Sequence, residues 1–192
     1  MIRPLLLISA LMAAALGCGR PSPVVTFHTL SPLSQPAAAQ RPLALEIMPV
    51  QLPELLQRSQ IVVLSSQGTH RLAPSHRWGN TLEKDLQRVL AENLSALLGS
   101  PSVVLYPEGT RTQATHRISL EVSQCDGTPG RTLLFRAIWM ITRLDTGRVA
   151  VLKRTSLEEA VGGPTIEDLV SAHDRLLERL SAEIAEALKA VP

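Results

Sequence analysis

The chain has 192 residues, of which 45% are hydrophobic and only 3% aromatic, with 19 basic and 17 acidic side chains. A formal net charge of +2 does not produce the basic patch that nucleic-acid binding requires, and few aromatic rings are present on which bases could stack. We therefore expect no nucleic-acid partner. The length is sufficient for one domain with a hydrophobic core.

The N-terminus has the layout of a secretory signal peptide. Arg3 precedes an apolar run over residues 5–16, and small residues follow at a break point. The run is about a dozen residues long, whereas a helix needs roughly 20 to cross a bilayer. The pattern therefore predicts a cleaved signal over residues 1–17 and not a membrane span.

Cys18 follows Ala15-Leu16-Gly17 directly, and this order resembles the lipobox of bacterial lipoproteins. The resemblance implies cleavage before Cys18, which would carry an N-acyl and an S-diacylglycerol group and anchor the protein durably. We expect no other cofactor. Gly19, in place of the aspartate that retains lipoproteins in the inner membrane, implies the periplasmic face of a Gram-negative outer membrane. The alternative is an ordinary secretory signal that ends beside a cysteine.

The sequence contains only two cysteines. If lipidation uses Cys18, Cys125 remains alone, so neither an intrachain disulfide nor a zinc site built on thiolates is expected. Cys125 ends a strand-like run and is predicted to be a small apolar core residue.

Residues 18–23 are predicted to form a tether, and residues 24–192 the folded domain. Proline and serine are frequent between Gly19 and Gln40, as in semi-extended linkers. The first half of the domain contains short β-type runs and one helical turn. The predicted strands are 24–30, 43–47, 61–64 and 69–72, and the turn is 53–56.

Two long amphipathic helices are predicted. Asn80, with Glu83 three residues later, can cap the first helix, and Gly99 can end it. Thr165 can cap the second helix, which follows Gly162-Gly163-Pro164. Leucines recur at helical spacing in both segments, so each helix needs an apolar surface to cover.

The segment between the helices is predicted to supply that surface as strands 103–106, 118–123, 133–141 and 148–155. Apolar residues alternate with polar ones over 118–123, which indicates one solvated face. Residues 133–141 are apolar at nearly every position, as expected of a central strand covered on both faces. The order of elements predicts an α+β single domain, a mixed, mostly antiparallel sheet with two long amphipathic helices packed on it.

The polar residues do not suggest catalysis. The five histidines are scattered, and no pair has the i,i+4 helical spacing of a metal-ligand set. His173 falls on the apolar stripe of the second helix, which favours a core histidine. Glu158-Glu159 and Glu167-Asp168 are interpreted as a solvated strand end and a helix-dipole pair. No nucleophile elbow, phosphate loop or dinucleotide motif is present. We therefore predict neither an enzyme nor a metal site.

Three segments in a fixed order carry a family resemblance. The first is the run Met48-Pro49-Val50-Gln51-Leu52-Pro53-Glu54-Leu55-Leu56-Gln57-Arg58, which continues to Val62. The second is Arg77-Trp78, which precedes a predicted helix. The third is Val89-Leu90-Ala91-Glu92-Asn93-Leu94. This order resembles the PqiC/YmbA family, the ABC-type transport auxiliary lipoproteins, over essentially the whole mature chain. His28, where the family tends to have an aromatic residue, and Leu56-Gln57 are departures.

The resemblance implies a non-enzymatic outer-membrane subunit that preserves envelope integrity. Its expected partners are a periplasmic mammalian-cell-entry (MCE) domain protein, which it would dock, and an inner-membrane permease, in a system that moves lipid between the membranes. A homo-oligomer is left open. Arg58 and Trp78 are the candidate partner-binding residues. Alternatively, Arg58 pairs with a nearby acid and Trp78 packs over the first helix.

Three other functions are left open by the sequence. The apolar strand 133–141 beneath two leucine-rich helices could enclose an acyl chain, which would make the protein a lipid carrier, although a packed core explains the same pattern. A purely structural envelope lipoprotein is a further alternative. A periplasmic hydrolase is suggested by the compartment alone.

Overall fold

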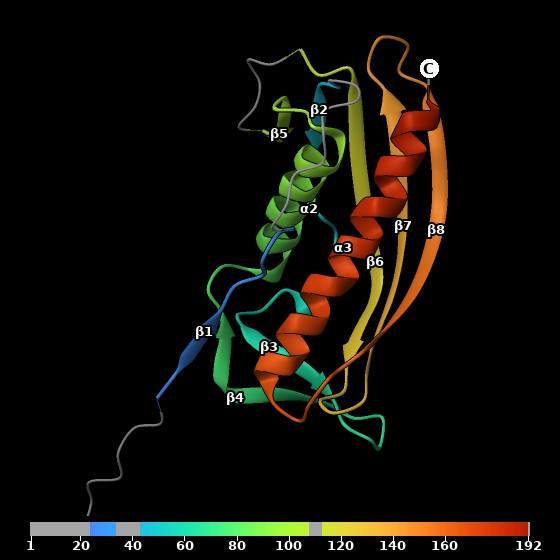
Figure 1. Cartoon of the computed structure of the whole chain (residues 1–192). Helices are drawn as coiled ribbons and strands as arrows, with labels where there is room; N and C mark the ends of the chain where they lie inside the picture. The colour runs from blue at the N-terminus through green and yellow to red at the C-terminus, as the bar shows by residue number, and fades with distance from the viewer. Residues whose placement is uncertain (1–23, 34–42, 108–112, 192) are drawn as a thin grey trace, which may run out of the picture.

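The computed structural model describes residues 24–33, 43–107 and 113–191. Two sheets and two long helices form one α+β domain, which confirms the predicted fold class (Figure 1). The predicted signal over residues 1–17 and tether over 18–23 lie outside the described residues. The elements, in chain order, are β1 (Thr26–His28), β2 (Leu45–Ile47), η1 (Glu54–Leu56), β3 (Gln60–Leu64), β4 (His70–Trp78), α2 (Leu82–Leu98), β5 (Val103–Leu105), β6 (His116–Gly127), β7 (Thr132–Arg143), β8 (Val149–Ala160) and α3 (Ile166–Ala190).

The larger sheet has the strand order β5-β2-β6-β7-β8. The strands β6, β7 and β8 form an antiparallel meander of long strands, joined by the turns that Gly130 and Gly147 allow with positive φ. The short strand β2 lies parallel to both β5 and β6. The sheet is therefore mixed, as predicted, with its parallel pairs at one edge.

The smaller sheet has the order β1-β4-β3 and packs at one end of the meander, where β3 contacts β6. Strand β4 is longer than the short strand predicted over 69–72, because it continues to Trp78 and pairs with β1 in parallel. This pairing brings the start of the described chain beside residues about 50 positions later. The sequence predicted one sheet, and the fold divides these strands between two.

Helix α2 has a different N-cap from the predicted one. The side chain of Thr81 accepts a hydrogen bond from the backbone N–H of Lys84, so Thr81 is the cap. Asn80 instead donates to the carboxylate of Asp85 at 3.4 Å. The C-terminal prediction is confirmed, because Gly99 ends the helix with φ of 58°.

Helix α3 begins as predicted at Thr165. The side chains of Thr165 and Asp168 form a capping box with each other's backbone N–H groups. Near this end, Gly127 at the end of β6 lies so close to α3 that a Cβ atom there would overlap the side chain of Leu169. The helix carries charges along its outer face, and no helix within the described residues is long and apolar enough to cross a membrane.

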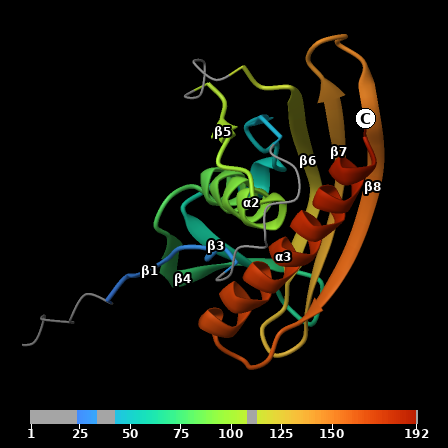
Figure 2. The same ribbon diagram turned by 45° about the horizontal axis from the view of Figure 1, so that its top comes forward.

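The two helices pack against each other and cover one face of the larger sheet, with α3 against β7 and β8 (Figures 1 and 2). The inward side chains of β7 are almost completely buried there: Leu133, Phe135, Ala137, Trp139 and Ile141. The outward side chains of β7 are half-buried or exposed. The prediction that this strand is covered on both faces is therefore wrong, since only one face carries helices.

Candidate functional site

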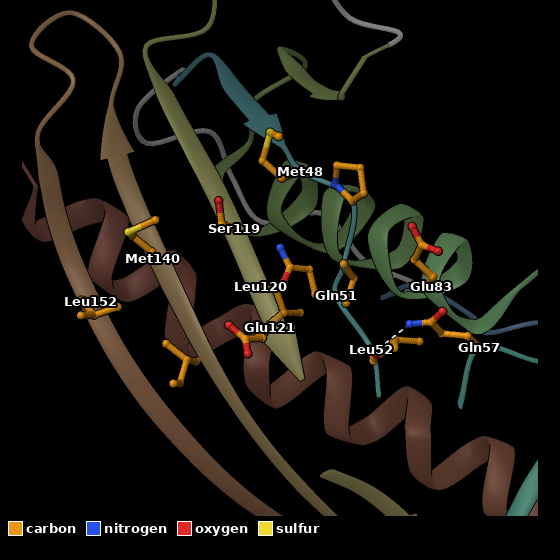
Figure 3. A pocket seen from close by; sticks show the side chains of 13 residues that line it. Met48, Gln51, Leu52, Gln57, Glu83, Ser119, Leu120, Glu121, Met140 and Leu152 are labelled. Carbon is orange, nitrogen blue, oxygen red and sulfur yellow. Dashed lines mark hydrogen bonds between the residues drawn. The ribbon is translucent and has the colours of Figure 1, made fainter. Parts of the chain in front are cut away.

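The face of the larger sheet opposite α3 carries an open groove of about 800 Å³. Its floor is formed by outward side chains of β6, β7 and β8, and one wall is formed by the segment 48–52 that follows β2 (Figure 3). Apolar side chains dominate this floor and wall: Met48, Pro49, Leu52, Ile138, Met140 and Leu152.

Strand register brings the apolar floor together. Met140 lies opposite Leu152 in the β7–β8 pair and opposite Ser119 in the β6–β7 pair. Residues that lie directly opposite each other on neighbouring strands point to the same face of a sheet. The side chains of Ser119, Met140 and Leu152 therefore share the outer face. Leu152 is 68% exposed, which is a large exposure for a leucine in the middle of a strand.

Backbone hydrogen bonds hold the wall of the groove in place. The N–H of Met48 donates to the carbonyl of Ile118 at 2.9 Å, and the N–H of Gln51 donates to Leu120 at 3.0 Å. The carbonyl of Gln51 accepts from Val122 at 2.8 Å. The segment therefore continues the edge of the sheet beside β6, and Pro49 lies where the chain bends outward from this ladder.

The polar lining of the groove is acidic. Glu83 at the start of α2 and Glu121 on β6 both line it, beside the amides of Gln51 and Gln57. No lysine or arginine is among the described residues that line it, and none of these residues forms a nucleophile–base pair. The groove can therefore accept an apolar surface with basic groups at its rim.

The two predicted partner-binding residues lie on neighbouring backbone segments, because the N–H of Trp78 donates to the carbonyl of Ser59, the residue after Arg58, at 2.8 Å. Trp78 at the end of β4 is only 4% exposed, and its ring meets that of His173 edge-on with centroids 5.6 Å apart. Its side chain therefore packs in the core, and a role for Trp78 in partner binding stays a prediction. Arg58 follows η1 and is half-buried. Cys18 lies outside the described residues.

Arg58 does not form the expected pair with an acid through its Nε atom. This atom is buried without a hydrogen-bond partner among the described residues. A buried unpaired N–H costs free energy, so the fold alone does not account for an arginine here. Arg58 adjoins Gln57, which lines the groove.

Cys125 and His173 meet in the core with Sγ and Nε2 3.6 Å apart. Burial raises the pKa of Cys125 to about 12, and burial lowers the pKa of His173 to about 4. His173 Nδ1 lies 2.8 Å from the carbonyl oxygen of Leu169, so this nitrogen carries the proton and Nε2 can accept from the thiol. The pair is thus a neutral thiol and a neutral imidazole, and the predicted core roles of both residues are confirmed.

The interior beneath β7 is packed with side chains. Trp139 is fully buried, and its Nε1–H donates to Thr155 Oγ1 at 2.8 Å, which in turn donates to Glu183 on α3 at 3.0 Å. This chain of hydrogen bonds fixes the helix against the sheet. The apolar pattern over 133–141 therefore serves the core on its inner face and the groove on its outer face.

The sequence did not identify the groove. The relevant pattern in the sequence is that Ile138 and Met140 are apolar and alternate with the core residues of β7. This pattern predicts burial on both faces of the strand, and it does not distinguish a covered face from an open apolar one. The parallel path of residues 48–52 beside β6 is a tertiary feature, and no local pattern indicates it.

This fold defines a class: a single α+β domain with two helices on one face of a mixed sheet and an open apolar groove on the other. The chain belongs to the family of ABC-type transport auxiliary lipoprotein components, whose sequence pattern matches residues 26–185. The predicted family is thereby confirmed. The family is one of transport auxiliary lipoproteins and is not an enzyme family. No curated protein matches the sequence.

Solved structures share the fold. An uncharacterized protein matches with a TM-score of 0.68 at 17% sequence identity, covering 86% of this chain and 99% of that one. A Xanthomonas campestris protein of the family DUF330 matches with a TM-score of 0.70 at 10% identity, covering 84% of this chain and 93% of that one. At these identities the likeness concerns the fold alone.

Proposed function

We propose that this protein is the outer-membrane subunit of an MCE-type intermembrane lipid transport system. Lipid on Cys18 holds the domain at the periplasmic face, where it docks the end of a periplasmic MCE-domain protein whose inner-membrane permease completes the system. The family match over residues 26–185 is the observation that carries this proposal, since it makes the chain an auxiliary lipoprotein of a transporter.

The groove is the surface that we propose receives the partner. A lipid anchor restricts the domain to a membrane but cannot select one protein among many, so selection requires a folded surface. Met140 and Leu152 supply an apolar centre, and Glu83 and Glu121 supply an acidic rim. An apolar centre with a charged rim is the general anatomy of a specific protein interface. The partner surface is expected to be apolar with basic residues around it.

The direct test is recovery of the partner from native membranes. The full-length protein, purified from detergent extracts of its own host, is expected to bring with it an MCE-domain protein and a permease. The same purification with Cys18→Ala, which removes the acylated side chain, should yield a protein without covalent lipid. Repeated purification of the wild-type protein without an MCE-domain partner would contradict the proposal.

Mass spectrometry of the same preparation separates this function from that of a lipid carrier. A docking subunit is expected to carry only its covalent lipid, attached at Cys18. Additional lipid that co-purifies at a fixed ratio to the chain, without any partner protein, would favour the carrier instead.

A further inference from the structure

Three potential metal ligands from three separate elements meet beside the first described strand. They are His28 at the end of β1, His76 on β4 and Glu167 in the first turn of α3. His28 Nε2 lies 2.9 Å from His76 Nδ1, and Glu167 Oε1 lies 4.0 Å from each of these nitrogens. The residues are far apart in the sequence, so no spacing pattern could have indicated the group.

The local fold explains this convergence. In the parallel pair of β1 and β4, Thr26 lies opposite His76 and His28 lies opposite Trp78. The two histidines are therefore two register positions apart, which places both side chains on one face of the small sheet. The capping box at Thr165 fixes the first turn of α3, and with it the backbone of Glu167 above the two rings.

The separations suit a small divalent cation. Zinc binds imidazole nitrogen and carboxylate oxygen at about 2.0–2.2 Å, so ligand atoms in a tetrahedral site lie about 3.3 Å apart. The observed separations of 2.9 Å and 4.0 Å bracket that value. Glu167 forms no hydrogen bond to either ring at 4.0 Å, and its side chain is 60% exposed, so it is free to close around an ion.

The exposure of the three side chains indicates an open site. His28 is 8% exposed, His76 is 28% exposed, and Glu167 faces solvent, so water could complete the coordination.

We propose that His28, His76 and Glu167 form a binding site for one zinc-class divalent cation. Two imidazoles with one carboxylate form a ligand set that binds zinc and also, as a facial triad, iron(II). The ion would connect β1, β4 and α3. Strand β1 pairs over only three residues and lies at an edge of its sheet, so a metal bridge would fix the strand that directly follows the predicted membrane tether.

The test uses the untagged full-length chain, purified in detergent, stripped of metal by a chelator and titrated with zinc sulfate. We expect one zinc per chain, and we expect cobalt substituted for zinc to show the intense visible bands of a tetrahedral ion. His76→Gln should weaken zinc binding by at least about tenfold, because loss of even an outer-shell partner costs that much. Glu167→Gln should weaken it as well.

His70→Gln is the matched control. His70 also lies on β4 and also contacts a carboxylate, with Nε2 2.8 Å from Asp126 Oδ1, but it has no third ligand. This variant should bind zinc like the wild-type protein. Because His28 is buried, the exposed positions His76 and Glu167 keep the test valid if His28→Gln does not fold.

A second readout concerns the strand itself. Zinc should slow amide hydrogen exchange over residues 26–28 in the wild-type protein and leave it unchanged in His76→Gln. Absence of zinc binding by the wild-type chain would overturn the proposal. The proposal would also be overturned if His76→Gln and Glu167→Gln bound zinc like the wild-type protein. It would be overturned equally if His70→Gln abolished zinc binding.

Discussion

His173 is a histidine that the fold requires to stay uncharged. It lies on α3 between Cys125 of β6 and Trp78 of β4, and no acid among the described residues shifts its pKa. Its Nδ1–H is used by the carbonyl of Leu169 one turn earlier. Burial therefore dominates its titration and lowers its pKa from 6.5 to about 4.

This burial predicts a loss of stability in mild acid. The unfolded chain binds a proton at His173 below pH 6.5, whereas the folded protein does so only near pH 4. The stabilising contribution is therefore complete above pH 6.5 and is lost as the pH falls toward 4. At pH 5 the loss should be about 2 kcal/mol of unfolding free energy. Urea unfolding of the wild-type protein and His173→Gln at pH 7.5 and pH 5.0 measures it.

The comparison between the two proteins isolates His173. Burial also lowers the pKa of His28, which adds acid sensitivity in the same direction, but to both proteins equally. The variant should therefore lose less stability than the wild type between the two pH values. Identical losses would show that His173 does not titrate as its burial requires.

Arg58, in contrast to His173, is not explained by core packing. Its Nε is buried without a hydrogen-bond partner among the described residues, and such a group makes no favourable contribution to folding. Its exposed neighbour Gln57 lines the groove and donates to the carbonyl of Leu52 at 2.7 Å (Figure 3). Arg58 remains a predicted partner-binding residue next to this groove-lining residue.

Arg58→Met separates a structural role from a binding role. Methionine retains much of the volume of the aliphatic stem and removes the unpaired N–H, so the unfolding free energy should stay within about 1 kcal/mol of the wild type or increase. Binding to the MCE-domain partner, measured by pull-down from membranes, should decrease. A large loss of stability with unchanged binding would assign Arg58 to the fold.

At the scale of elements, side chains of both helices hold the segment that follows β1. They accept hydrogen bonds from its backbone N–H groups. The N–H of Ser31 donates to Asp174 on α3 at 2.9 Å, and that of Leu33 donates to Asn93 on α2 at 2.8 Å. The amide of Asn93 also donates to Ser181 Oγ at 3.2 Å, which joins α2 to α3. Asn93 belongs to the Leu90-x-x-Asn93-Leu94 segment that carried the family resemblance, and this is its structural role.

Asn93→Ala should therefore destabilise the domain. The substitution leaves the partly buried N–H of Leu33 and the buried hydroxyl of Ser181 with fewer partners, which costs about 2 kcal/mol. Glu92→Ala on the same helix is the matched control, since its pair with Arg88 is exposed and contributes only about 0.5 kcal/mol. Thermal unfolding followed by circular dichroism measures both variants. Equal melting temperatures for the two variants would contradict the assigned role of Asn93.

At the scale of the whole molecule, the larger sheet has two different faces. Helices α2 and α3 cover one face, and the other carries the groove with Met140 and Leu152 at its floor. An apolar sheet face without a helix is a surface that association with another protein would cover. The proposed function therefore depends on the difference between the helix-covered face and the groove-bearing face of the larger sheet. It does not depend on a cluster of reactive groups.

Leu152→Asp should abolish docking without unfolding the domain. Leu152 is exposed, so the change should alter the unfolding free energy by only about 0.5 kcal/mol. In a complex, however, the new carboxylate would be buried in an apolar interface, so binding should weaken at least about tenfold. Surface plasmon resonance with the purified MCE-domain partner measures the affinity.

Val149→Asp is the control for the groove. Val149 is also an exposed apolar residue of β8, but it lies near the hairpin and does not line the groove. Its replacement should leave the affinity unchanged. If both substitutions weakened binding equally, or neither did, the groove would not be the docking surface.

Local sequence patterns determined most of the elements. The long strands, the two helices, the ends at Gly99 and Thr165 and the alternation over 118–123 follow from hydrophobic period and capping chemistry, which act within a few residues. The family was also evident from the order of its motifs. The cap of α2 was misassigned because Asn80 and Thr81 are adjacent and both are able to cap.

The surfaces that remain open and the distant side chains that meet follow from how the elements pack, which local sequence does not indicate. Ile138 and Met140 are apolar in either case, so composition could not show that no helix covers their face. Likewise, His28, His76 and Glu167 meet because β1 pairs in parallel with β4 beneath the start of α3. Strand pairing and helix placement depend on burial summed over the whole chain, and no short segment of sequence encodes that sum.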